Sequence, residues 1–348
     1  MKSPLILLCI PLILGGCNEE TSPLEDSTRV ALQPNITTAA PSRSIVNGIG
    51  TGDDQISTIS IYVTRAADNT AYPGAPAAAV FSAPATAGQP WTTTPTFYVN
   101  ATEGRLYAYS PSNLTVTGNA PAAPTVPVSI PATQNFDGAS TIACSTVDYL
   151  YGSASNTPGQ ADAISVSSTA NTPAIYLQHA LSRIIFTIKY APSRPSDDQY
   201  DFVKSVSLDG TNLFRAGDGT MQLNDGTLSL TACSKLSFKA TATPQLPGKN
   251  GTPTPVAYGL VAPKPEIAST TTNAVTLHLV LGEKGNDNNN RTLSVTPDSF
   301  FNQTWEKGRS YTYSLVLDAS KVTIESVTIN PWNEIGNEDS TEMPPSIE

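Results

Sequence analysis

The sequence predicts an all-β protein, and three observations carry this prediction. The chain of 348 residues contains 23 Gly and 29 Pro, and it is also rich in Thr, Ser and Val, which together favour short strands joined by turns. Apolar residues alternate in many short segments, and no helical period persists beyond two turns. Only 14% of the residues are charged while 39% are hydrophobic, so the chain can bury a core and is not of the disordered class.

The charge balance and the few reactive side chains narrow the classes of function. The chain has 19 Lys and Arg against 29 Asp and Glu, a net charge of −10. A nucleic-acid surface needs clustered cations, and the sequence contains no such cluster. Two His and four Cys leave little material for metal or nucleophilic chemistry. Composition therefore favours a secreted β protein with a binding or structural role, and it argues against an enzyme.

Residues 1–16 are typical of a signal peptide. Lys2 precedes the apolar run Leu5–Leu14, which is too short to stay in a membrane as a spanning helix. The run ends in Leu-Gly-Gly before Cys17, which resembles the bacterial lipobox. We therefore expect Cys17 to carry acyl chains such as palmitate that anchor the precursor in the outer membrane. An ordinary secretory signal followed by a chance cysteine is the alternative.

Residues 17–43 are predicted to form a tether and one short strand. The Asn-Glu-Glu triplet after Cys17 resembles the surface-export signal of lipoproteins in Bacteroides-type anaerobes, although a solvated tether would have the same composition. Farther on, Val30, Leu32 and Ile36 share one face under period-2 alternation.

The rest of the chain divides into two stretches of predicted strands. The segment 174–190 has the strongest alternation, and its apolar parity changes near Ser182 and Arg183, which predicts a bulge or a bend between two sheets. The Pro-containing stretch after residue 191 then predicts a domain boundary, with an N-terminal domain at 44–192 and a C-terminal domain at 193–348. Other strands are expected at 55–64, 96–100, 105–110, 202–208, 236–240, 256–261, 275–281, 291–295, 311–317 and 322–329, and long loops at 70–90 and 119–133.

Several segments, taken in their order along the chain, form a pattern that is typical of one protein family. They are the lipobox at Cys17, the arginine Arg43 after a short strand, and the segments His179–Phe186, Trp305–Leu315 and Ile329–Trp332. Together they cover nearly the whole chain and resemble the fimbrillin family, the Mfa-like or type V pilins. The resemblance implies two tandem transthyretin-like (Greek-key) β-sandwich domains.

The same resemblance implies how such a subunit assembles. A trypsin-like protease would cut between Arg43 and Ser44 and remove residues 17–43, although Arg29, Arg65 and Arg105 are alternative tryptic positions. The preceding Pro/Ser/Thr-rich sequence makes Arg43 the preferred one. Removal would leave a groove that a strand from another subunit fills, in a head-to-tail polymer.

A candidate donor strand lies near the C-terminus. A donor should show the same alternation of apolar and polar residues as the removed strand. Two pairs meet this requirement, Val322 with Ile324 and Val327 with Ile329. The alternation changes phase at Glu325-Ser326, as if two short strands met there.

No catalytic, cofactor or metal site is predicted. His179 lies between Leu and Ala in a strand, which favours a buried, hydrogen-bonded side chain, and His278 is distant in sequence. Three Asp-Gly pairs, at Asp209, Asp218 and Asp225, are predicted turns. Cys144 and Cys233 remain after processing, and whether they form a disulfide is left open. Trp91, Trp305 and Trp332 suit core packing or, less simply, a sugar-stacking surface.

Two functions are weighed on these grounds. The first is a structural subunit of a surface fimbrium that supports adhesion and colonisation. The alternative is a surface-exposed glycan-binding β-sandwich lipoprotein of a nutrient-uptake system, which would keep both its lipid and its N-terminal strand.

Overall fold

The computed structural model of the chain confirms the all-β prediction. Every regular element that it describes is a strand, twenty in all. The structure describes residues 28–38, 56–74, 78–86, 89–118, 120–137, 143–144, 146–195, 198–240, 253–267, 274–283, 286–296 and 300–332. Within these ranges, no helix is long and apolar enough to cross a membrane.

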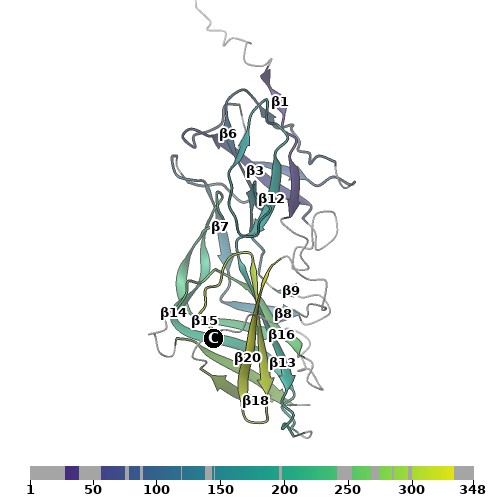
Figure 1. Cartoon of the computed structure of the whole chain (residues 1–348), viewed down its shortest axis with the longest axis vertical. Coiled ribbons are helices and arrows are strands. Elements are labelled where there is room, and N and C mark those ends of the chain that lie inside the picture. The colour runs from purple at the N-terminus through teal and green to yellow at the C-terminus, as the bar shows by residue number, and fades with distance from the viewer. Residues whose placement is uncertain are drawn as a thin grey trace, which may run out of the picture.

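The molecule is elongated, and the N-terminal half forms its upper part (Figure 1). One sheet dominates this half, in the order β2-β12-β10-β6-β3-β4, with β11 also paired to β6. Two short strands, β1 (Val30–Ala31) and β5 (Tyr98–Val99), pair apart from it. The strands of the sheet are β2 (Asn35–Thr38), β3 (Thr58–Arg65), β4 (Ala79–Ser82), β6 (Gly104–Ser110), β10 (Leu150–Ser153), β11 (Ile164–Val166) and β12 (Ala174–His179).

The C-terminal half consists of two sheets that pack over one apolar core. The first has the order β16-β13-β19-β20, and its strands are β13 (Ser182–Tyr190), β16 (Thr254–Val261), β19 (Arg309–Leu317) and β20 (Val322–Pro331). The second has the order β18-β17-β14-β15-β8-β9, with β7 also paired to β14. Its strands are β7 (Thr125–Ile130), β8 (Thr133–Asp137), β9 (Ala143–Cys144), β14 (Phe202–Gln222), β15 (Leu228–Ala240), β17 (Thr276–Glu283) and β18 (Asn286–Val295).

Strand pairing crosses the domain boundary expected between residues 192 and 193. β13 pairs with β16 and β19, and β7 and β8 pair with β14 and β15. Segments from before residue 193 therefore complete both C-terminal sheets. The domain limits stay a prediction, but each C-terminal sheet contains strands from both predicted domains, 44–192 and 193–348.

The predicted parity change near Ser182 marks the point where the chain leaves one sheet for the other. β12 ends at His179 in the N-terminal sheet, and β13 begins at Ser182 in the four-stranded sheet. Ala180 and Leu181 between them are fully buried. A bend between two sheets, one of the two expected outcomes, is therefore what the alternation had signalled.

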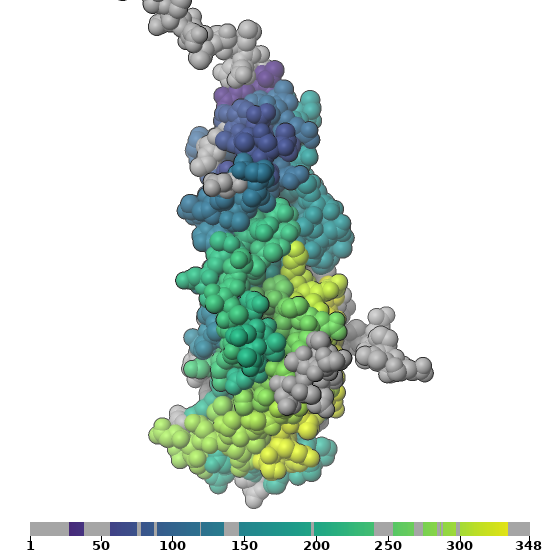
Figure 2. Space-filling view, turned by 90° about the vertical axis from the view of Figure 1, so that its left-hand side faces the viewer, coloured from purple at the N-terminus to yellow at the C-terminus, as the bar shows by residue number. Residues whose placement is uncertain are grey.

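A third apolar cluster joins the two halves at the waist of the molecule. It combines tyrosines of β6 and β10 with Met221 and Leu223 near the end of β14, with Leu260 and with Trp332. Figure 2 shows the green β14–β15 region reaching up against the blue N-terminal half. Continuous apolar packing of this kind couples the halves more firmly than a polar linker would.

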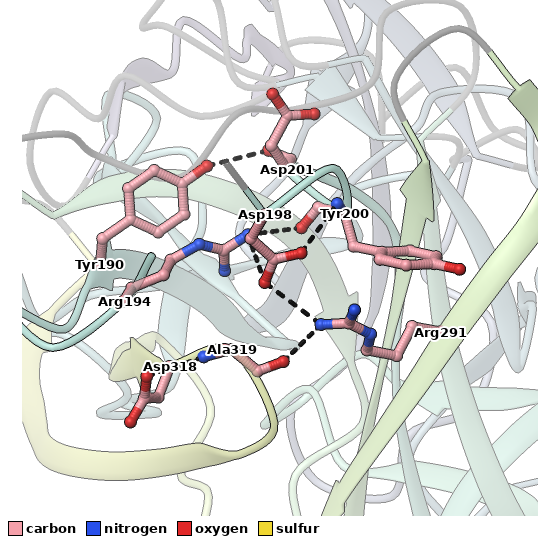
Figure 3. A network of polar contacts seen from close by, with 8 residues as sticks. All are labelled: Tyr190, Arg194, Asp198, Tyr200, Asp201, Arg291, Asp318 and Ala319. Carbon is pink, nitrogen blue, oxygen red and sulfur yellow. Dashed lines mark hydrogen bonds and ion pairs between the residues drawn. The ribbon is translucent and has the colours of Figure 1, made fainter. Parts of the chain in front are cut away.

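At the opposite end of the C-terminal half, one carboxylate organises a polar network (Figure 3). The Asp198 side chain, 5% exposed, lies 3.3 Å from Arg194 and 3.2 Å from Arg291, and it accepts a hydrogen bond from the Tyr200 backbone N–H. Arg291 also donates to the Ala319 carbonyl oxygen. The network ties the segment after β13 to β18 and to the β19–β20 turn.

The described backbone places Cys144 and Cys233 apart, so the disulfide left open between them gains no support and stays a prediction. Cys233 is a free thiol whose Sγ lies 3.7 Å from the Lys235 carbonyl oxygen. Cys144 pairs with Phe136, which in turn pairs with Ala240. Cys233 is seven residues along β15 from Ala240, about 23 Å at strand spacing, whereas a disulfide requires Cα atoms within about 7 Å.

Candidate functional site

The candidate site is the place where the N-terminal segment 28–38 lies against the body of the protein, at the top of Figure 1. We call the residues that hold it, 97–99 and 171–177, the strand seat. β1 pairs antiparallel with β5, and β2 then pairs parallel with β12. Because β12 is the next strand in from β2, the N-terminal segment forms one edge of the N-terminal sheet.

The segment is held by its apolar side chains. Leu32 and Ile36 are 4% and 3% exposed, and both belong to the core of the N-terminal half. Pro34 between them is buried as well, while Gln33, Asn35 and Thr37 are exposed. Val30, expected on the same face, is only half-buried because it lies at the outer end of the seat. Period-2 alternation thus places residues 32, 34 and 36 in the core.

Backbone hydrogen bonds to both sides of the seat fix the register. The Leu32 N–H donates to the Phe97 carbonyl oxygen at 2.9 Å, and the Gln33 N–H donates to the Asn171 carbonyl oxygen at 2.8 Å. The Asn171 side chain returns a bond to the Ala31 carbonyl oxygen at 2.9 Å. The segment therefore bridges two parts of the chain more than 70 residues apart.

The entry to the seat carries weaker contacts. The Arg29 guanidinium donates to the Gly74 carbonyl oxygen at 3.3 Å and lies 5.6 Å from the centroid of the Tyr98 ring. Tyr98 is 43% exposed. Contacts of this kind near solvent are worth about 1 kcal/mol or less, so most of the stability of the segment comes from Leu32 and Ile36.

Removal of the segment would change the seat in two ways. The outer edge of β12 would lose its parallel partner from Asn35 to Thr38, leaving unpaired backbone groups that invite another strand. The core would lose two aliphatic side chains, each worth about 1.5–3 kcal/mol of burial. An extended peptide with apolar side chains at alternate positions is the chemistry that fits both losses.

Three predicted site residues lie outside the described part of the chain, namely Cys17, Arg43 and Ser44. Their lipidation and cleavage remain predictions.

The candidate donor segment forms β20, the edge strand of the four-stranded sheet, paired with β19 in the same chain. Val322 is buried, and Ile324 and Val327 pack against the C-terminal core. The register shifts so that Glu325 is the extra residue, at the predicted phase break. Ile329 is 47% exposed. To act as the donor strand for a second copy, β20 would have to separate from β19.

The two histidines lie in different settings. His179 stacks on Trp332 with ring centroids 3.9 Å apart, and its Nδ1 lies 3.0 Å from the buried Asp148 carboxylate. His278 lies on the other half, 3.2 Å from Asp209. Within the described residues, no group of His, Cys, Asp and Glu is arranged to hold a metal ion.

The three tryptophans are all core residues. Trp91 is 3% exposed, and Trp305 and Trp332 are each 1% exposed. None of them presents a face on which a sugar could stack, so the packing interpretation of these residues is confirmed.

Sequence reasoning identified the strand but missed its seat. Phe97, Asn171 and Pro173 hold the backbone of the segment, but nothing in their local sequence marks them. Their role follows from pairing between segments far apart in the chain, which one sequence does not reveal.

Comparisons with known proteins agree with the fold. A family model described as fimbrillin-like matches residues 42–332. A proposed cell adhesion protein from Bacteroides uniformis is 16% identical, with a TM-score of 0.53 over 88% of this chain and 99% of its own. A fimbrial protein from Bacteroides vulgatus is 14% identical, also with a TM-score of 0.53, over 87% of this chain and 99% of its own. No curated protein matches the chain.

Proposed function

Because the chain belongs to the fimbrillin-like family, we propose that it is a structural subunit of a cell-surface fimbrium that supports adhesion. Its role is to build a polymer, and we assign it no catalytic step. The similarity in fold to a fimbrial protein over nearly the whole of both chains supports this role.

The precursor is anchored before assembly. Acyl chains on Cys17 hold it in the outer membrane, and the acidic tether that follows carries it to the outer face. Residues 17–43 connect this anchor to the body, so one cut after Arg43 releases both the lipid and the strand that occupies the seat.

A strand of a neighbouring subunit then fills the emptied seat. The observation that carries this step is the position of β2 at a sheet edge, with Leu32 and Ile36 buried against the core. The incoming strand replaces the hydrogen bonds along β12 and the two aliphatic side chains. Val322, Ile324, Val327 and Ile329 remain the candidate donor residues. The contact joins different surfaces on the two copies, and repetition gives an open fibre.

Limited trypsin treatment of the purified protein tests this function. We expect Ser44 to become the N-terminus by mass spectrometry, and a ladder of oligomers to appear on an unheated gel. An Arg43→Ala variant should stay monomeric under the same treatment, whereas an Arg65→Ala variant should behave as the parent protein does. Cleavage after Arg43 without any ladder would refute strand exchange.

The glycan-binding alternative gains no support from the described residues. The tryptophans that would stack on sugar rings are buried, and a seated N-terminal strand is expected of both functions before cleavage.

A further inference from the structure

A cleft of about 580 Å³ lies at the waist, apart from the strand seat. It is formed where the β14–β15 turn, the segment after β16 and the loop before β19 meet. Four cationic residues line it, Arg215, Lys264, Lys307 and Arg309, against one acidic residue, Glu306. The lining therefore carries a net charge of +3, four cations less one acid, in a chain whose net charge is −10.

Two of these cations are held without a carboxylate partner. Lys264 is 3% exposed, and its ammonium donates to the Pro265 and Gln303 carbonyl oxygens at 3.1 and 2.8 Å. Lys307 donates to the Asp225 carbonyl oxygen and lies 4.9 Å from the Tyr151 ring centroid. Among the described residues, neither ammonium forms an ion pair.

Burial makes these charges costly. It lowers the pKa of Lys264 to about 8 and lowers the pKa of Lys307 as well, and the nearby charges of Glu266 and Asp225 offset this only in part. An anionic group in the cleft would relieve the cost, because an opposite charge favours the protonated amine. The same cleft has apolar walls, including Leu228, Leu230 and Trp305.

The chain itself supplies a segment with the matching chemistry. Residues 333–348, beyond the described part, contain five acidic residues and no Lys or Arg. They also contain Ile335, Met343 and Ile347. Sixteen residues can span up to about 50 Å, which is ample for a cleft that begins beside their first residue.

The point of departure lies at the cleft. The Trp332 N–H donates to the Gly308 carbonyl oxygen at 2.8 Å, and Pro331 pairs with Arg309. Gly308 stands between two lining residues, Lys307 and Arg309. We propose that the acidic C-terminal tail, residues 333–348, docks in the basic cleft of its own chain.

Carbodiimide cross-linking of the full-length protein tests this proposal, because the reagent joins an amine to a carboxylate that it contacts. Peptide mass spectrometry should find Lys307 joined to Glu338, Asp339 or Glu342, which lie farther along the tail than the residues tethered beside Lys307. The same reaction at high ionic strength serves as the control, because salt weakens docking through charge but leaves the tethering of the tail beside Lys307 unchanged. A mixture of isotope-labelled and unlabelled protein separates bonds within one chain from bonds between chains.

Matched variants sharpen the result. Arg215→Gln and Arg309→Gln keep the reporting lysine but remove a cleft charge, and each should lower the Lys307 yield by about threefold. Arg65→Gln, an exposed arginine on the N-terminal half, should leave the yield unchanged. A Lys307 yield that is unchanged at high salt, or no response to the cleft variants, would overturn the proposal. Cross-links that join labelled to unlabelled chains would overturn the assignment to the same chain.

Discussion

An Ile36→Asp substitution is expected to release the N-terminal strand and to start oligomer formation without any protease. Ile36 is 3% exposed and packs in the core of the N-terminal half. The variant loses about 2–3 kcal/mol of aliphatic burial, and a carboxylate in the same place costs several kcal/mol more. Since β2 is an edge strand, it can leave the sheet while the other strands stay paired. Unheated gels and size-exclusion chromatography of the uncleaved protein would measure the effect.

Thr37→Asp is the matched control for this experiment. Thr37 neighbours Ile36 in β2, but its side chain is exposed, so the same new charge stays in solvent and the protein should remain monomeric. Similar behaviour of the two variants would mean that burial of Ile36 does not keep the seat closed.

A Trp332→Ala substitution is expected to lower the free energy of unfolding by about 3–5 kcal/mol. Trp332 is 1% exposed and stacks on His179 with centroids 3.9 Å apart. The Arg183 guanidinium lies 5.8 Å from its ring centroid. The ring thus joins the end of β20 to the start of β13 in the cluster that links the two halves. Denaturant unfolding followed by circular dichroism would give the difference.

Val147→Ala serves as the control for the loss of the tryptophan. Val147 neighbours Asp148, the partner of His179, but its own side chain is 43% exposed. Its truncation should change the free energy of unfolding by less than about 0.5 kcal/mol. A loss near 1 kcal/mol for Trp332→Ala would show that the waist tolerates the cavity and that the ring does not secure β20.

The alternation of apolar residues predicted many of the strands well. The stretch 55–64 covers all of β3 except Arg65, and 105–110 matches β6 within one residue. Alternation also located the bulge at Glu325 and the change of sheet before Ser182. These features depend on local side-chain order, which a sequence displays directly.

Glycine-containing segments were predicted less well, because glycine serves more than one purpose. Asp225-Gly226 forms the expected turn, and Gly226 has φ = 72°. Gly210 and Gly219 instead lie inside the 21-residue strand β14. A Cβ at Gly219 would lie 2.0 Å from the Ser229 carbonyl oxygen, so glycine there permits close strand pairing. Propensity alone does not distinguish these uses.

Two loops predicted from their Ala/Pro/Gly content contain strands. β4 lies within 70–90, and β7 lies within 119–133. β7 pairs with β14 about 90 residues later in the chain. Pairing with strands far along the chain decides the structure of these segments, and local sequence does not reveal such pairing. The strand seat could not be predicted for the same reason.

A competition experiment tests the central claim that a strand from another copy replaces the N-terminal strand. Protein cleaved after Arg43 is mixed with a synthetic peptide of residues 28–38, and oligomer growth is followed on unheated gels. The peptide should reoccupy the seat and stop growth, while a peptide carrying Ile36→Asp should have no effect. Growth that proceeds unchanged with the native peptide in large excess would contradict the account.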